Sequence, residues 1–458
     1  MRHVVQRIHL QLGDFWWYSL LLFLALRCGD VINAFVGLWL VPKYVPQAEL
    51  GAVLAITNFA SVFGLPITIL VTVYTKFLSR YQALGQVDKV KSLLQWFIGA
   101  SIIFVLVSSL LSVVLLPLFF ERIRIVSGSL GLLIVFSGII GAVTPVFSNA
   151  LQGLKKFNAL TVQNFLSAPI RLVAMLVAIP FRALSGYMLG QVAAPLFTIC
   201  WAGFSLRHEL RREVKATPFW KDDGRRLLKY LGCVSVWFLT GVPYAALFTM
   251  IVRQRLPEVE SAAYYMISRF AELGTYAGVT MAVVMFPLVS EAHAKGEPTE
   301  GILRKVNIAT LAFGALATLV FFFFGGFILG LLPTSAPYSR FSFDMSLLCT
   351  SLVLGQIWSN YTSHEIAKER FTFLLYGVPL TVLHIVTLIC FTGYSFFYGI
   401  FSQSIVDWMG SMNLATLRNI LWLQLVVLIC RIVLAWIESV IRANRACRVY
   451  SMRSSMGK

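Results

Sequence analysis

Twelve long apolar runs divide this chain, and they constrain its fold more than any other feature of the sequence. A helix that crosses a membrane needs about 20 mostly apolar residues. The runs cover approximately residues 15–40, 52–75, 93–119, 129–153, 159–180, 184–206, 230–252, 262–289, 304–332, 342–363, 371–391 and 414–440. Only 13% of the 458 residues are charged, about half the share in an average soluble domain. The sequence therefore predicts an all-α polytopic membrane protein with 12 transmembrane helices.

The basic residues predict which side of the membrane each loop faces. Of the 38 lysines and arginines, 26 fall in the segments on the side of the N-terminus, and seven fall in the segments on the other side. Cytoplasmic loops carry the excess of positive charge, so we expect both termini in the cytoplasm. The net charge of +18 is then a signal of topology and of attraction to anionic membrane lipids, and no nucleic-acid partner is needed to explain it.

The two halves of the chain repeat each other weakly. Val45–Glu49 after the first run and Leu256–Glu260 after the seventh share a Pro and a Glu at a shift of 211 residues, and the same shift relates Gly85 to Gly296. We therefore predict two pseudo-symmetric six-helix bundles around a central cleft. Their expected bounds are residues 1–215 and 230–458, the latter with a basic cytoplasmic tail, joined by a basic cytoplasmic linker at 216–229.

Two segments resemble a known group of transporters. Residues 40–51, LVPKYVPQAELG, look like the opening of the polysaccharide (O-antigen and capsule repeat-unit) flippases of the multidrug/oligosaccharidyl-lipid/polysaccharide exporter superfamily. Residues 149–157, NALQGLKKF, are similar to that family's Gln-Gly segment. The resemblance implies a flippase in the bacterial inner membrane that moves undecaprenyl-diphosphate-linked oligosaccharide from the inner to the outer leaflet by alternating access. It also implies a polysaccharide polymerase and a chain-length regulator as protein partners.

Charged residues inside the apolar runs are the candidate substrate site. A cation at mid-bilayer costs about 2.5–3.5 kcal/mol and is tolerated mainly where it faces a bundle interior or a wet cavity. Arg27 and Asp30 are spaced to share one helix face, and Arg269 and Glu272 repeat that spacing. Together with Arg171, these arginines match the charge of a diphosphate. Hydrogen-bonding groups for sugar hydroxyls are expected from Asn33, Asn58, Gln356 and Asn360.

Each of these assignments has an alternative that the sequence leaves open. The Arg and the acid of each pair can simply neutralise one another within one helix. Asp30 is the candidate for coupling to a proton or a sodium ion, although the neighbouring positive charge of Arg27 opposes its protonation. Three further groups can be structural or functional: Arg418 as a snorkelling residue near the interface, Arg431 on one helix face with Glu438, and His384 as a packing residue or a proton relay.

The sequence also leaves other functions open. A cation-coupled multidrug exporter of the same superfamily is one alternative, and it should have an acidic cavity to suit cationic drugs. A membrane-embedded polysaccharide polymerase or transferase is the other, but no phosphate-binding glycine loop or catalytic set is found. We expect no enzymatic activity and no cofactor. The seven cysteines show no CxxC spacing, so we also expect no metal site.

Overall fold

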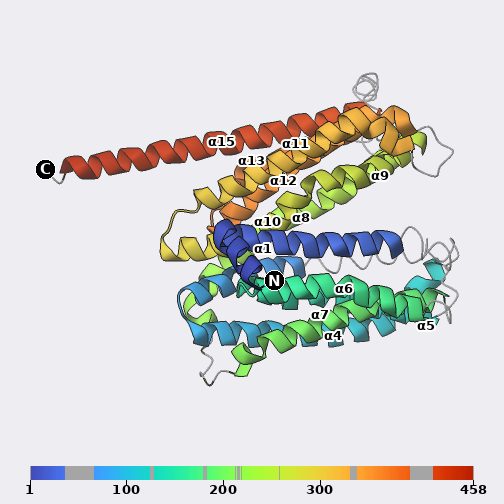
Figure 1. The fold of residues 1–458 in the computed structure, drawn as a ribbon, viewed down its shortest axis with the longest axis horizontal. Coiled ribbons are helices and arrows are strands. Elements are labelled where there is room, and N and C mark those ends of the chain that lie inside the picture. Colours follow the sequence, from blue (N-terminus) through green and yellow to red (C-terminus); the bar gives the residue numbers. More distant parts are fainter. Residues whose placement is uncertain are drawn as a thin grey trace. The chain divides into compact units, whose positions relative to one another are not determined.

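The computed structural model is helical throughout the part of the chain that it describes, with no strands there (Figure 1). It describes residues 2–36, 67–123, 128–178, 183–211, 213, 217, 219–256, 258–330, 338–391 and 416–456. Eight helices in these residues are long and apolar enough to cross a membrane, and Leu374–Leu388 adds a shorter apolar helix. Backbone polar groups in lipid must be paired within the chain, which helices achieve. The predicted all-α membrane fold is confirmed.

The chain forms two compact units, and each is described by itself. Unit 1 comprises Met1–Ser235 and Val283–Pro298, and unit 2 comprises Val236–Ala282 and Thr299–Lys458. Two helices contribute to both units, because α8 passes from one to the other after Ser235 and α10 passes between them at Ala282. Part of the second half of the sequence therefore packs with the first half. The two predicted repeats, joined by the linker at 216–229, were defined by the order of helices along the chain and not by contacts. They stay a prediction.

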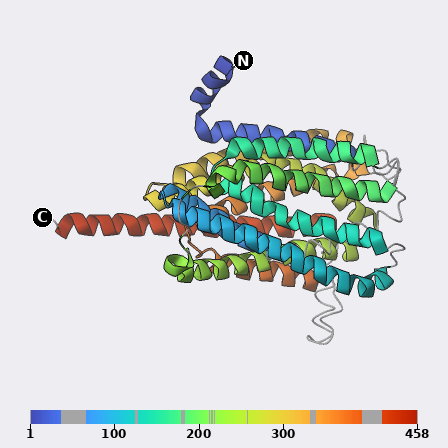
Figure 2. The ribbon, with the colours of Figure 1, turned by 90° about the horizontal axis from the view of Figure 1, so that it is seen from below.

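Unit 1 is built from long helices that pack in neighbouring pairs. They are α1 (Arg2–Phe35), the helix of residues 67–83, α4 (Val87–Ile123), α5 (Gly128–Gly153), α6 (Phe157–Ala178), α7 (Ala183–Arg211) and the first part of α8 (Trp220–Arg255). α6 packs against both α1 and α7, and α5 packs against α4 and α7. Figure 2 shows the first turns of α1 angled away from the rest of that helix. α8 begins inside the predicted linker, so its basic residues from Trp220 onward are helical.

Unit 2 is held together by helices α11, α12 and α15. Its elements are the second part of α8, α9 (Glu258–Ala271), the 3-10 turn η2 (Glu272–Thr275), the first part of α10 (Tyr276–Lys295), α11 (Glu300–Gly330), the 3-10 turn η3 (Tyr338–Phe341), α12 (Ser342–Ala367), α13 (Leu374–Phe391) and α15 (Leu417–Met456). The last part of α15 extends beyond the other helices of unit 2 (Figure 1).

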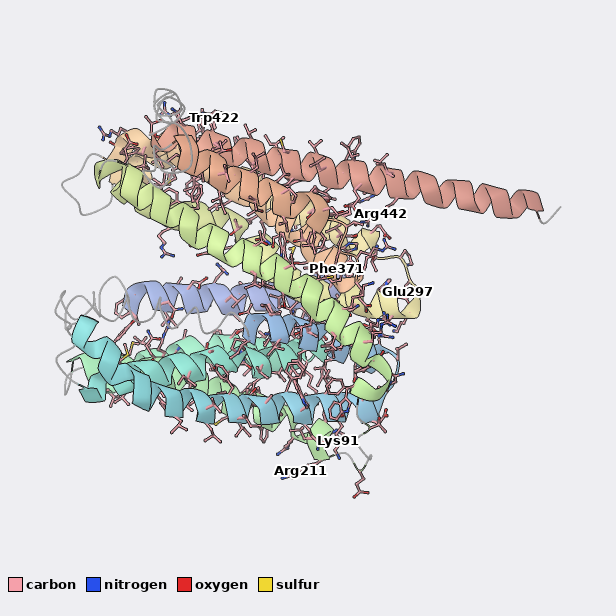
Figure 3. All side chains as sticks on the ribbon, turned by 180° about the vertical axis from the view of Figure 1, so that it is seen from behind. Lys91, Arg211, Glu297, Phe371, Trp422 and Arg442 are labelled. Atoms are coloured by element: carbon pink, nitrogen blue, oxygen red, sulfur yellow. The ribbon has the colours of Figure 1, made fainter. Side chains whose placement is uncertain are left out.

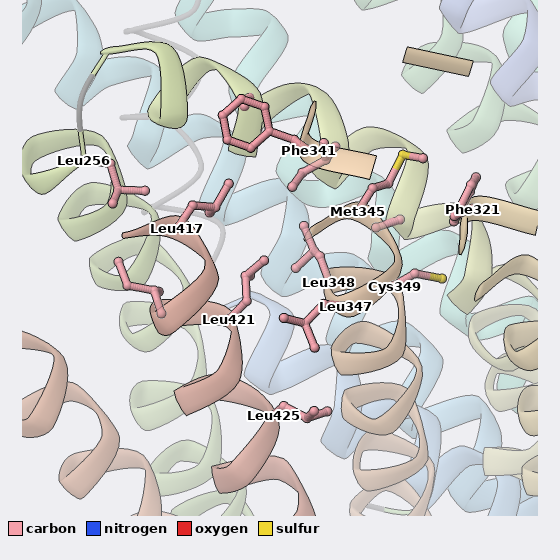
Figure 4. Close-up of a cluster of buried hydrophobic side chains, with 14 of the residues drawn as sticks. Leu256, Phe321, Phe341, Met345, Leu347, Leu348, Cys349, Leu417, Leu421 and Leu425 are labelled. Carbon is pink, nitrogen blue, oxygen red and sulfur yellow. The ribbon is translucent and has the colours of Figure 1, made fainter. Parts of the chain in front are cut away.

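An apolar core joins these helices at one end of unit 2. In Figure 4, Leu417, Leu421 and Leu425 of α15 face Leu347 and Leu348 of α12, and all five are buried. α15 begins where Glu260 of α9 accepts a 2.7 Å hydrogen bond from the backbone N–H of Leu417. A carboxylate at a helix N-terminus satisfies a free N–H group and suits the helix dipole. α9 therefore fixes where α15 enters the unit.

Four turns between helices share one hydrogen-bonding pattern. In each, a residue with positive φ follows the helix, its N–H bonds to the carbonyl three residues back, and the next N–H bonds to the carbonyl five residues back, which is the Schellman motif. The residues with positive φ are Gly85, Lys155, Gly296 and Glu369. Gly85 and Gly296 are the pair that the predicted repeat matches, so their equivalent turns agree with that repeat.

One predicted transmembrane helix is interrupted. The apolar run at 262–289 consists of α9, then η2, then α10, because a 3-10 turn replaces the α-helix over Glu272–Thr275. A Cβ added at Gly274 within this turn would lie 2.6 Å from the sulfur of Cys349 on α12. A glycine is therefore needed where η2 approaches α12. Breaks of this kind inside a helix often mark hinges or functional sites.

Candidate substrate site

The charged pair of α1 lies in the membrane-spanning part of unit 1. The guanidinium of Arg27 is 2.7 Å from the carboxylate of Asp30, and the two side chains are 22% and 45% exposed. Arg27 also lies 5.6 Å from the ring centre of Phe23, a cation–π distance. Asn33 is exposed one turn farther along α1. The predicted shared face is present, and the pair is close to neutral by itself.

Arg171 on α6 differs from Arg27, because no carboxylate of the described residues lies within ion-pair distance of it. It is half-buried, and its buried Nε has no hydrogen-bond partner in the part of the chain that the structure describes. A Cβ at Gly190 would lie 3.2 Å from the carbonyl oxygen of Arg171, so α7 approaches α6 closely here. A guanidinium in this setting can receive an anionic group with paired hydrogen bonds.

α1 and α6 bring the two sets of charges to neighbouring helices. A Cβ at Gly29 would lie 3.6 Å from the Cβ of Ala168 on α6. Asp30 follows Gly29 directly, and Arg171 lies three residues after Ala168 on the same helix face. The polar residues predicted on these two helices therefore lie within about one helical turn of each other along the helix axes.

The second charged pair lies at the interrupted helix of unit 2. Arg269 is in the last turn of α9 and Glu272 begins η2, and their side chains are 3.5 Å apart. They are 62% and 45% exposed, so solvent or lipid reaches both. Broken helices at membrane depth form sites for ions and substrates in other transporters. The sequence predicted this pair from its spacing but not the break between its members.

Gln356 and Asn360 of α12 belong to a buried amide cluster in unit 2. The side chain of Asn360 is fully buried, donates to Asn307 and Thr310 of α11 at 3.1 Å and accepts from Gln356 at 2.8 Å. With all these bonds satisfied inside the unit, Asn360 fixes α11 against α12. Gln356 is half-buried and is the member closer to the surface. Asn58 lies outside the described residues, so its role stays a prediction.

Arg418, Arg431 and His384, whose roles the sequence left open, have definite surroundings in the structure. Arg418 forms hydrogen bonds with both carboxylate oxygens of Asp344 at 3.0 and 3.4 Å, so an ion pair holds its guanidinium. Arg431 is buried and donates to Thr381 of α13 at 2.6 Å. His384 is buried on that same helix. Glu438, on the helix face that it shares with Arg431, has partners on other helices.

Glu438 belongs to a polar cluster that the sequence did not predict. Its carboxylate accepts hydrogen bonds from Tyr361 and Tyr376 at 2.8 Å, and it contacts Thr372 and Arg442. Arg442 also contacts the buried Glu365, next to His364. Figure 3 shows Arg442 near the turn that carries Phe371. The signal was the presence of two glutamates near the ends of apolar runs, but Tyr376 lies 62 residues from Glu438 and Arg442 lies 77 residues from Glu365.

Solved structures that resemble this chain share its whole fold. A crystal structure of the Vibrio cholerae MATE transporter VcmN in variant form is 17% identical, with a TM-score of 0.72, and covers 96% of this chain and 98% of its own. An outward-facing multidrug resistance MATE transporter of the MOP superfamily is 13% identical, with a TM-score of 0.69 and coverage of 94% and 97%. The chain therefore has the MATE-transporter fold and is a multi-pass membrane protein.

A third similar structure concerns the polarity of the site. It is a MOP superfamily transporter from Pyrococcus furiosus, 15% identical, with a TM-score of 0.66 and coverage of 94% and 97%. Its description states that reverse polarity of the binding pocket suggests a different function. No model of a known protein family matches this chain. No curated protein matches it either.

Proposed function

We propose that this chain is a membrane transporter without enzymatic activity. The observation that carries the proposal is the MATE-transporter fold, which extends over nearly the whole chain and over nearly the whole of each similar structure. Charged residues inside the spans support it, since such residues usually mark a substrate or ion path. The expected movement is alternating access between two bundles, with the interrupted helix and the helix prolines as bending points.

Multidrug export is the function that the similar structures favour. One of them is described as a multidrug resistance transporter, and none of those named above is described as moving an oligosaccharide. In this case the paired charges Arg27–Asp30 and Arg269–Glu272 keep the path close to neutral. Asp30 is then the residue we propose for coupling to a proton or a sodium ion.

The setting of Arg171 favours the second candidate function, which is the flipping of lipid-linked oligosaccharide. Arg171 is half-buried and has no carboxylate of the described residues within ion-pair distance. Such an arginine does not help to bind an organic cation, but it can form an ion pair with a diphosphate. Arg27, Arg171 and Arg269 would then contact the diphosphate. Asn33, Asn58, Glu272 and Gln356 would contact the glycan, and the buried Asn360 would hold Gln356 in place.

One pair of assays separates the two candidates. The chain would be expressed in a drug-hypersensitive strain, with ethidium efflux measured, and in a strain that lacks its O-antigen flippase, with surface polysaccharide measured. An exporter restores efflux, and Arg171→Ala leaves efflux unchanged or raises it. A flippase restores polysaccharide, Arg171→Ala removes most of that recovery at equal protein abundance, and Arg171→Lys retains part of it. A chain that is inserted and abundant but restores neither would contradict both candidates.

A further inference from the structure

The second part of α10 is fastened to helices from the first half of the chain. Residues 283–298 belong to unit 1, whereas Tyr276–Ala282 of the same helix belong to unit 2. The end of unit 1 reached by this segment carries many of the basic residues predicted to face the cytoplasm. We call it the basic end, and Figure 3 shows Lys91 and Arg211 there. Apolar side chains of this segment are buried, Val284, Met285 and Val289 among them, and polar contacts add to their packing.

Two hydrogen bonds and an ion pair make the polar part of the attachment. Gln152 of α5 donates to the carbonyl oxygen of Val283 at 2.7 Å. Ser290 of α10 donates to the carbonyl oxygen of Lys76 at 3.2 Å, and this bond is buried. Lys155, in the turn after α5, forms an ion pair with Glu291. Each contact joins α10 to a different point of the first half.

Lys155 occupies a backbone position that its residue type disfavours. Its φ is +55°, and it holds the place in its Schellman turn that Gly85 and Gly296 hold in two other turns. A residue with a Cβ is strained in this region, and glycine is not. Strained positions persist where the surrounding structure holds them, and they often lie at functional sites. At Lys155 the ion pair with Glu291 is one of the contacts that hold the turn.

The ion pair is placed so that it can open. The side chain of Lys155 is 33% exposed and that of Glu291 is 17% exposed, and pairs with this access to solvent are weak. Glu291 also accepts a 2.8 Å hydrogen bond from Lys295, four residues on. Glu291 therefore keeps a cationic partner after Lys155 leaves, which lowers the cost of separation.

We propose that Gln152, Lys155 and Glu291 form a latch that holds the second part of α10 at the basic end and must release before the transporter changes conformation. The inference rests on the proposed transport function. α10 runs without interruption from Tyr276 in unit 2 to Lys295 in unit 1, so the latched segment is continuous with unit 2 through one helix. Pro287 lies inside the latched segment and gives it a bending point.

The latch is tested by the accessibility of a buried residue on α10. Val289 is fully buried, and Val289→Cys in a cysteine-free background reports opening by its labelling rate with maleimide. Lys155→Asn removes the charge but keeps a residue that tolerates positive φ. We expect labelling to be about fivefold faster, which corresponds to about 1 kcal/mol. Lys155→Glu should increase it further, and adding Glu291→Lys should return it towards the starting rate.

Lys156→Asn is the matched control. Lys156 lies in the same turn and pairs with Glu209 of α7, so its loss removes a similar ion pair without touching α10. Labelling that responds equally to both substitutions, or to neither, contradicts the latch. Lys155→Gly keeps the test valid if Asn disturbs the turn. If labelling responds as expected but no substrate is transported, the latch stands and the proposed function fails. If transport is present and labelling is unchanged, only the latch fails.

Discussion

Lys155 in unit 1 and Glu369 in unit 2 occupy equivalent positions in two Schellman turns, with φ values of +55° and +58°. Around Lys155 the side chains reach α10, a helix from the other half of the sequence. Around Glu369 the contacts stay within one half, since Lys368 pairs with Glu300 and Glu365 contacts Arg442. One turn geometry thus serves a weak attachment in unit 1 and a buried cluster in unit 2. The difference predicts that substitutions in unit 2 should cost stability, whereas those near Lys155 should change movement.

Arg442→Ala should have the largest effect on stability. It leaves Glu365 and Glu438 close together without their shared cation, and breaking such a buried arrangement costs about 3 kcal/mol. Thermal unfolding in detergent should show a clear fall in Tm. Arg211→Ala is the control, since Arg211 is exposed at the end of α7 and its loss should change stability by less than about 0.5 kcal/mol. Equal Tm values for the two variants would remove the contrast between the units.

Gly296→Ala should have the next largest effect. Gly296 has φ +76° and nothing within 4 Å of an added Cβ, so backbone strain alone should cost about 1–2 kcal/mol. Gly203→Ala is the control, because its added Cβ also meets nothing within 4 Å and its φ is not positive. Unfolding in detergent measures both. A Gly296→Ala protein as stable as Gly203→Ala would show that positive φ is not costly in these turns.

Glycine substitutions at Lys155 and Glu369 should separate strain from attachment. Glu369→Gly relieves the strained backbone, and we expect a gain of about 0.5–1 kcal/mol in stability. Lys155→Gly relieves the same strain but also loses the pair with Glu291, which offsets about 0.2–1 kcal/mol of the gain. The Tm should therefore rise for Glu369→Gly and change little for Lys155→Gly. A larger rise at Lys155 would mean that its ion pair contributes nothing.

Salt should give the smallest effect. The Debye length falls from about 10 Å at 0.1 M to about 3 Å at 1 M salt, and exposed pairs are screened more than buried ones. The Tm difference caused by Glu291→Gln should therefore shrink at high salt. The difference caused by Arg442→Ala should persist. If high salt reduced both Tm differences equally, the ion pairs of Glu291 and of Arg442 would be equally exposed to solvent.

The fold followed from the sequence because the constraints on it are local. Apolar runs predict helices, and Gly85 and Gly296 predict matching turns. The pairs Arg27–Asp30 and Arg269–Glu272 were found because their members are three residues apart. Spacing along one helix is readable from a single chain, and the structure contains both pairs.

The remaining site features depend on distant contacts. Asp344 and Arg418 are 74 residues apart, and no local pattern connects them. The break at η2 contains no proline, and it depends on Gly274 meeting α12. Whether Arg27 and Arg269 face a common cleft stays a prediction.

The length of α15 sets what its far end can do. Its 40 residues make a rod of about 60 Å at 1.5 Å per residue, while the hydrocarbon core is about 30 Å thick. The helix is therefore about twice as long as the hydrocarbon core is thick, and its apolar span Leu417–Arg442 ends at the cluster that contains Arg442. A rigid rod magnifies rotation about its anchored part, and a tilt of about 10° shifts a tip about 30 Å away by roughly 5 Å. A small rotation of α15 within unit 2 would therefore move its far end by a distance that spectroscopic labels on this helix can measure.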